Sequence, residues 1–105
     1  MKNTITEKAM PVSLAKNLVN SIPYGTKFHC VRSMNAYITD ILEINNGLYR
    51  FIKSYDTIVA IYDYDNNTYT EFGKYSVTTS KQVTTIYNIE FSRFGVSREF
   101  NPCHL

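Results

Sequence analysis

Apolar positions recur at helical spacing near the start of the chain. Leu14, Ala15, Leu18, Val19 and Ile22 fall on one face at a period of about 3.6 residues. Pro11 opens this segment and Pro23 closes it, because proline lacks the N–H that a helix interior needs. The pattern predicts a helix over 12–22, preceded by a loose polar arm over 1–10.

The middle of the chain predicts strands instead. Runs rich in β-branched and aromatic residues cover 48–52, 57–62 and 68–72, and clusters of Asn, Asp, Ser and Gly separate them. Side chains alternate along a strand, so Ile58, Ala60 and Tyr62 are expected to share one face. A further short strand is expected within 26–33.

Residues 34–44 fit two interpretations. Met34, Tyr37, Ile38, Ile41 and Leu42 are spaced as one face of a helix. The turn signal Asn45-Asn46-Gly47 favours a strand that forms a hairpin with the run after it. Both alternatives stay open from the sequence.

A second helix is predicted over 80–91. Thr79 followed three residues later by Gln82 has the form of a capping box, and Val83, Ile86 and Tyr87 continue at helical spacing. The tail over 92–105 shows no regular pattern. Together these elements predict a single α+β domain over 1–105, with one antiparallel sheet of three to five strands and both short helices on one face. The expected core is Leu14, Leu18, Ile22, Phe51, Ile58, Ala60, Tyr62, Phe72, Val83, Ile86 and Tyr87.

Composition narrows the class of protein. The chain has 105 residues, 44% of them hydrophobic, and a net charge of +2, which excludes a polyanionic mimic of DNA. The sequence shows neither a secretory signal nor a membrane-length apolar run, and two cysteines are too few for a disulfide scaffold. These features predict a cytoplasmic protein with reduced thiols. Residues 35–72 carry two basic and six acidic side chains, whereas residues 1–34 carry five basic and one acidic.

Two segments resemble a known group of proteins. Residues 54–60 read S-Y-D-T-I-V-A and residues 75–81 read Y-S-V-T-T-S-K. They are similar to a signature, S-Y-x-T-x-V-A then Y/W-S-x-T-T-S-K, of small proteins encoded by phages, plasmids and other mobile elements of bacteria. The resemblance covers residues 47–91, and Gln82 stands where those proteins often have His. It implies a location in the bacterial host cell but no particular activity.

Metal ligands and cofactor motifs are not predicted. Asp63, Asp65 and Asn67 match the start of a calcium loop, but Thr68 and Lys74 stand where Gly and Glu are required, so a turn is expected. His29-Cys30 and Cys103-His104 lack the spacing of a zinc knuckle, and Cys30 is expected to be a small buried hydrophobe. We expect no metal and no cofactor.

Two candidate binding regions remain. Thr79, Ser80 and Lys81 at a helix start are candidates for a phosphate contact, although capping alone explains Thr79. Tyr55, Tyr64 and Tyr69 fall at strand ends or in turns, and with Asp63 and Asp65 they predict an acidic, tyrosine-bearing surface for partner binding.

The sequence therefore predicts a non-enzymatic accessory protein of a phage or mobile element that binds a host protein. The specific version is an inhibitor of a defence nuclease, of the anti-CRISPR kind, whose partner is a nucleic-acid enzyme. The alternative is a small nucleic-acid-binding module that uses Lys81, Arg93, Arg98 and exposed tyrosines. No membrane partner is expected, and the oligomeric state stays open.

Overall fold

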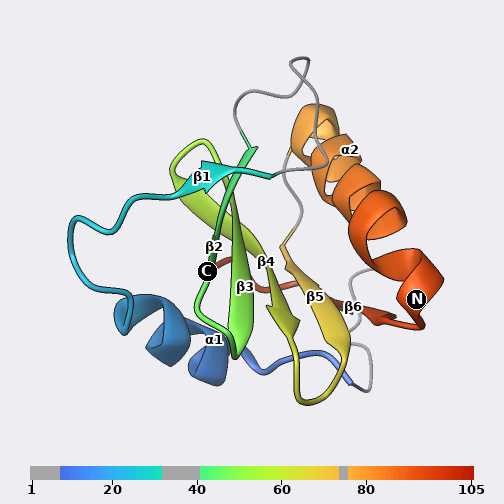
Figure 1. The fold of residues 1–105 in the computed structure, drawn as a ribbon, viewed down its shortest axis with the longest axis horizontal. Helices are drawn as coiled ribbons and strands as arrows, with labels where there is room; N and C mark the ends of the chain where they lie inside the picture. Colours follow the sequence, from blue (N-terminus) through green and yellow to red (C-terminus); the bar gives the residue numbers. More distant parts are fainter. Residues whose placement is uncertain (1–7, 32–40, 74–75) are drawn as a thin grey trace.

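A computed structural model describes residues 8–31, 41–73 and 76–105 (Figure 1). In chain order the elements are α1 (Val12–Asn20), β1 (His29–Cys30), β2 (Ile41–Asn45), β3 (Tyr49–Ser54), β4 (Thr57–Asp63), β5 (Thr68–Phe72), α2 (Val77–Ile86), a π-helical turn η1 (Tyr87–Phe91), a 3₁₀ turn η2 (Ser92–Phe94) and β6 (Ser97–Asn101). The α+β class and the first helix are confirmed.

The six strands within the described residues form one sheet whose spatial order follows the chain, β1 to β6. Strands β1 to β5 pair antiparallel, and β6 pairs parallel to β5. The predicted count of three to five strands was too low and the sheet is mixed, because the tail expected to be irregular contains β6. The segment from α2 to η2 supplies the long crossover that a parallel pair requires.

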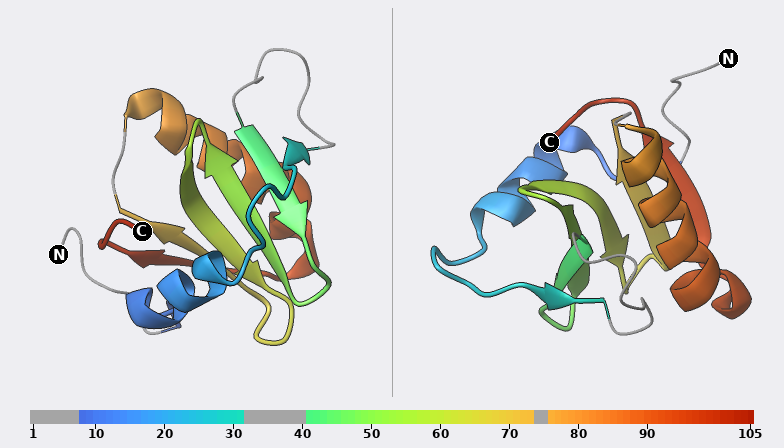
Figure 2. Two further views of the ribbon diagram at one scale, coloured as in Figure 1. Left: turned by 90° about the vertical axis from the view of Figure 1, so that its left-hand side faces the viewer. Right: turned by 90° about the horizontal axis from the view of Figure 1, so that it is seen from above.

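The two helices cover opposite faces of the sheet, so their predicted placement on one face was wrong (Figure 2). Ala15 of α1 packs with Phe51 and Phe72 on one face, whereas Val83 and Ile86 of α2 belong to the cluster on the other. The physical reason lies in β4, whose residues from Ile58 to Asp63 are all buried. A strand buried on both sides must have a layer on each face.

A register shift between β3 and β4 explains why the predicted face of β4, with Ile58, Ala60 and Tyr62 together, was wrong. Ile52 pairs with Ala60 but Lys53 pairs with Ile58, so Val59 is an extra residue in β4. Such a bulge reverses the alternation beyond it. Ile58 therefore belongs to the α1 cluster while Ala60 and Tyr62 belong to the α2 cluster, contrary to the expectation of one shared face.

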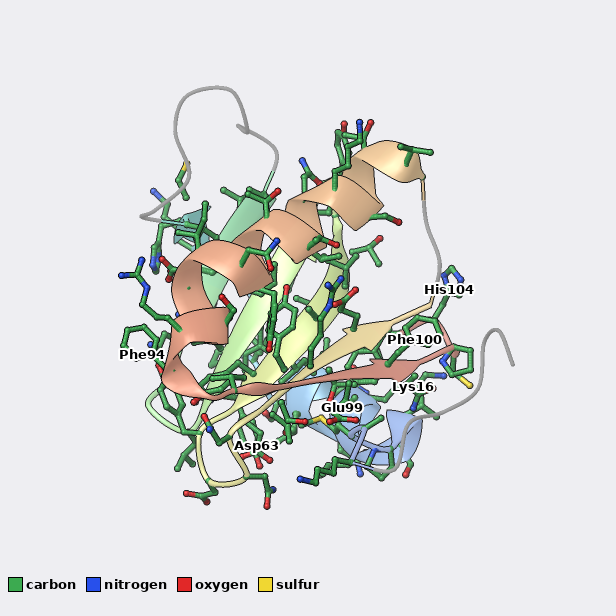
Figure 3. All side chains as sticks on the ribbon, turned by 90° about the vertical axis from the view of Figure 1, so that its right-hand side faces the viewer. Lys16, Asp63, Phe94, Glu99, Phe100 and His104 are labelled. Atoms are coloured by element: carbon green, nitrogen blue, oxygen red, sulfur yellow. The ribbon has the colours of Figure 1, made fainter. Side chains whose placement is uncertain are left out.

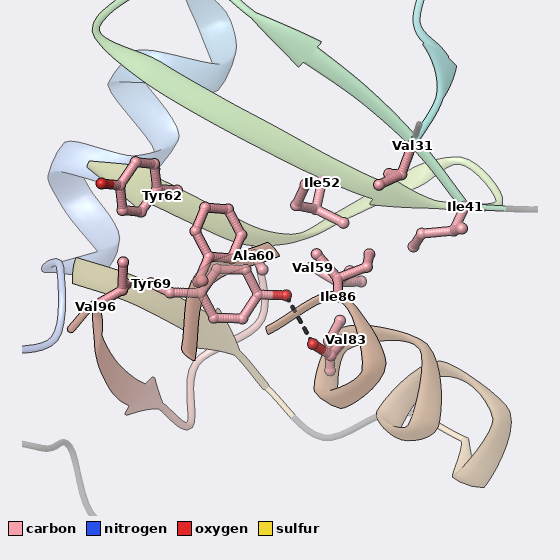
Figure 4. Packing of buried hydrophobic residues seen from close by; sticks show 11 residues of the cluster. Val31, Ile41, Ile52, Val59, Ala60, Tyr62, Tyr69, Val83, Ile86 and Val96 are labelled. Carbon is pink, nitrogen blue, oxygen red and sulfur yellow. Dashed lines mark hydrogen bonds between the residues drawn. The ribbon is translucent and has the colours of Figure 1, made fainter. Parts of the chain in front are cut away.

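The predicted core is otherwise largely confirmed. The buried members are Phe51, Ile58, Ala60, Tyr62, Phe72, Val83 and Ile86. Leu18, Ile22 and Tyr87 are half-buried. Leu14 is 41% exposed and does not belong to the core. Figure 4 shows the cluster between the sheet and α2.

Helix α2 begins earlier than predicted. Ser76 is its N-cap, and its side-chain oxygen accepts a hydrogen bond from the Thr79 backbone N–H at 3.2 Å. The prediction of Thr79 as the cap was therefore wrong. Its supposed capping partner Gln82 is buried and faces the sheet instead.

Of the segment with two interpretations, residues 41–44 belong to strand β2, and 34–40 lie outside the described residues. None of the helices in the described ranges is long and apolar enough to cross a bilayer.

Candidate functional site

The predicted tyrosine-bearing surface is divided between two hairpin turns and the core. Tyr55 lies in the turn between β3 and β4, and Tyr64 and Asp65 lie in the turn between β4 and β5. The two turns are at opposite ends of β4 (Figure 1). Seven residues of extended strand separate them by about 20 Å. They are therefore two separate tips rather than one edge.

Tyr69 is not part of any surface. Its side chain is completely buried, its ring lies 5.1 Å from that of Phe91, and its hydroxyl donates to the Val83 carbonyl at 3.0 Å (Figure 4). The prediction of Tyr69 as a partner contact was wrong. Side chains alternate along β5, and this alternation places Tyr69 on the face of the sheet that α2 covers. The position of Tyr69 at a strand end did not indicate that it is buried.

Asp63 also has a structural role. It is buried, and its Oδ1 accepts hydrogen bonds from the backbone N–H groups of Asp65 and Asn66 at 3.0 and 3.2 Å. Its Oδ2 accepts from Asn66 Nδ2 at 2.8 Å. Figure 3 shows Asp63 beside this turn. This carboxylate stabilises the turn, and the prediction of a turn at Asp63, Asp65 and Asn67 is confirmed. Asp65 is the exposed acid of this turn.

Tyr64 is 39% exposed and partly held by the fold. Its hydroxyl accepts a hydrogen bond from Asn45 Nδ2 at 2.6 Å, and its ring meets that of Tyr62 edge-on at 4.8 Å. Its backbone N–H donates to the Leu48 carbonyl at 3.2 Å. The Tyr64 ring therefore lies on a tip formed by the β2–β3 turn and the β4–β5 turn.

Tyr55 is 58% exposed at the opposite tip. It forms a two-residue turn with Asp56, closed by the pair Ser54 and Thr57. Asp56 is also exposed. Each tip therefore presents an exposed tyrosine followed directly by an exposed aspartate.

A buried polar network fixes the base of the Tyr55 tip. The Ser54 hydroxyl donates to Gln82 Oε1 at 2.8 Å and lies 3.3 Å from the Thr79 hydroxyl. Ser76 in turn bonds to Thr79. These contacts join the two sequence segments 54–60 and 75–81 in space. No local pattern in the sequence indicated that the two segments meet.

The candidate phosphate residues do not converge on one surface. Thr79 is buried and its N–H is bonded to the Ser76 side chain, while the Ser80 N–H bonds to the Ser76 carbonyl at 3.0 Å. Ser80 and Lys81 instead line a shallow hollow of ≈ 430 Å³ on the outer side of α2. Arg98 pairs with Glu71 and donates to the Thr84 hydroxyl at 2.7 Å. Two of the N–H groups that would hold an anion are therefore already used within the helix.

The sequence did not indicate a second buried polar group around Arg50. Its guanidinium donates to Glu43 and Glu90 and lies 4.9 Å from the centre of the Phe91 ring. Removing Arg50 would leave two carboxylates without their shared cation, and its bond to Glu90 joins η1 to the sheet. It is a structural element beside the Tyr64 tip.

The two cysteines form no disulfide. Cys30 and Cys103 are both free and exposed, so the expectation that Cys30 is buried was wrong. Its strand β1 has only two residues, both exposed, at the edge of the sheet. Within the three described ranges, His, Cys, Asp and Glu side chains form no group of three that could hold a metal ion.

Comparison with models of protein families gives a match over most of the chain. Residues 15–98 match the model of a family of unknown function, DUF8033, which spans all elements from α1 into β6. No curated protein matches the chain. No solved structure matches it either.

Proposed function

Because the chain belongs to DUF8033, a family whose function is unknown, we propose a function from its own geometry: it is a non-enzymatic accessory protein that binds another protein through its hairpin tips. The proposed setting is a phage or other mobile element, and the proposed partner is a protein of the bacterial host. The specific form is inhibition of a defence nuclease in the manner of an anti-CRISPR protein.

The observation that carries this proposal is the exposed Tyr-Asp pair at each end of β4. Tyr55 and Tyr64 are 58% and 39% exposed on tips of the six-stranded sheet. Tyrosine is enriched among residues that dominate binding energy, because a rigid ring gives a large contact area at a low cost in conformational entropy. Tyrosine rings on turns that the sheet holds in place are therefore suited to contact a partner protein.

The acidic neighbours favour a basic partner surface. Asp56 and Asp65 are exposed beside the two tyrosines, in the part of the chain where acidic side chains outnumber basic ones six to two. A carboxylate next to an aromatic ring can pair with a lysine or arginine that also contacts the ring. Nucleic-acid enzymes present such groups in the channels that bind phosphate, which agrees with the nuclease proposal.

Capture from a bacterial lysate tests the proposal. The immobilised chain is incubated with lysate that has or has not been treated with nuclease, and bound protein is washed over a range of salt concentrations. We expect the same host protein to be retained after nuclease treatment. Tyr55→Ala and Tyr64→Ala should reduce its retention, whereas Tyr24→Ala, which removes a fully exposed tyrosine outside the sheet, should not.

The opposite pattern would favour nucleic acid as the ligand. Capture that disappears with nuclease, falls steeply with salt and is abolished by Lys81→Ala or Arg98→Ala would replace the proposal with the nucleic-acid-binding alternative.

A further inference from the structure

The backbone of Tyr55 adopts a conformation that tyrosine disfavours. Its φ is 54°, and among the described non-glycine residues only Asn67 shares a positive φ. Asparagine tolerates this region, because its short side chain can bond locally, whereas a bulky residue there is an outlier. At the first position of a two-residue hairpin turn with positive φ, glycine is the preferred residue.

Packing does not account for a tyrosine at this position. The side chain is more than half exposed, unlike Tyr62 and Tyr69, which are buried in the α2 cluster. A glycine would adopt the same turn without the steric cost. Strained residues of this kind persist where the surroundings hold them in place, and they gather at functional sites.

The surroundings do hold this turn in place. Ser54, the residue before Tyr55, is buried and bonded to Gln82, and its hydroxyl lies 3.3 Å from that of Thr79. The base of the turn is thereby fixed to the first turns of α2. The backbone that carries the ring is therefore ordered before binding, which reduces the entropic cost of ordering this turn on contact.

We propose that Tyr55 is the principal partner-contact residue, kept in a strained turn at the expense of stability so that its ring projects beside Asp56. The inference deepens the proposed protein-binding function and rests on it. The partner surface it fits is a pocket for an aromatic ring with a lysine or arginine at its rim, within reach of the Asp56 carboxylate.

A three-variant series at this position separates strain from contact. Tyr55→Gly relieves the backbone and removes the ring, Tyr55→Ala removes the ring but keeps the strained φ, and Tyr55→Phe keeps the ring. Each variant is measured by thermal unfolding and by titration against the purified host protein that the wild-type chain captures after nuclease treatment.

We expect stability and binding to move in opposite directions in the Gly variant only. The Gly variant should unfold about 4 °C above wild type, while the Ala and Phe variants should unfold within about 2 °C of it. The Gly and Ala variants should both bind about 30-fold more weakly, and the Phe variant should bind within about threefold of wild type.

Two results would overturn the inference alone. A Gly variant no more stable than wild type would refute the strain, and an Ala variant with unchanged affinity would refute the contact, even if Tyr64→Ala weakens binding and the proposed function stands. If the wild-type chain captures no protein after nuclease treatment, the proposed function fails and the contact role of Tyr55 fails with it, whatever the unfolding data show.

Discussion

Replacing Tyr69 by phenylalanine tests the assignment of this tyrosine to the core. The hydroxyl of Tyr69 donates to the Val83 carbonyl at 3.0 Å inside the α2 cluster, and the side chain is completely buried. Phenylalanine keeps the ring contacts with Phe91 and Tyr87 and removes only this hydrogen bond. The substitution therefore isolates the hydroxyl.

The expected loss at neutral pH is modest. The Val83 carbonyl also accepts a hydrogen bond from the Tyr87 backbone N–H, so the substitution leaves it with a partner. An intramolecular hydrogen bond of this kind contributes about 1 kcal/mol net. Tyr69→Phe should lower the free energy of unfolding by about that amount.

The stability difference between wild type and variant shrinks at alkaline pH. Burial raises the pKa of Tyr69 well above its usual value, whereas in the unfolded chain tyrosine ionises near pH 10. Above about pH 10 the unfolded state loses a proton that the native state retains, so stability falls as pH rises. Phenylalanine has no such proton, and its variant should lose stability less steeply above that pH. Part of the slope should remain, because burial also raises the pKa of Tyr62.

Urea unfolding followed by circular dichroism between pH 7 and 11 measures both effects. We expect the variant to be less stable than wild type at pH 7, and its disadvantage should shrink or reverse by pH 11. Parallel curves for wild type and variant across this range would show that Tyr69 ionises equally in both states. Tyr69 would then have to be accessible, as the sequence had suggested.

Three further substitutions or treatments test other parts of the fold. Ser76→Ala should lower the free energy of unfolding by about 1 kcal/mol through loss of the helix cap, and an unchanged urea midpoint would reject Ser76 as the cap. Gly73→Ala should destabilise more than Gly47→Ala, since both have positive φ but a β-carbon at Gly73 would lie 2.5 Å from the His104 ring; equal melting temperatures would contradict this packing. Dialysis against a chelator should leave the melting temperature unchanged, and zinc in the purified protein together with a lower melting temperature would make metal ligands of His29, Cys30, Cys103 or His104.

Local chemistry explains which elements the sequence could predict. Prolines at 11 and 23 bracket α1, and turn residues separate β3, β4 and β5, so these elements were found to within two residues. The bulge at Val59 has no local signal, because it depends on the pairing between two strands. Strand β6 was missed because its short segment shows no alternation of apolar and polar residues, and its parallel partner β5 is distant in sequence.

The first residue of α2 was predicted wrongly because the sequence contains two candidate N-caps. Ser76 and Thr79 are both good caps, and Gln82 three residues after Thr79 favoured the later start. In the structure Gln82 faces Ser54 of a different element, which a local pattern cannot show.

For the candidate site, the exposure of Tyr55 and Tyr64 followed from their places in turns. The burial of Asp63 and Tyr69 did not, because it depends on the turn that Asp63 builds and on the position of α2.

Site-specific photo-crosslinking tests whether the hairpin tip that carries Tyr55 contacts a host protein. The photoreactive residue p-benzoylphenylalanine replaces Tyr55 in one variant and Tyr24 in another, and each full chain is irradiated in nuclease-treated bacterial lysate. Both positions are exposed, but only Tyr55 lies on a hairpin tip of the sheet. A contact role for Tyr55 predicts one dominant crosslinked protein at position 55, identical to the captured partner and lacking at position 24. Crosslinks that are the same at both positions, or that form at 55 only when nucleic acid is present, would contradict it.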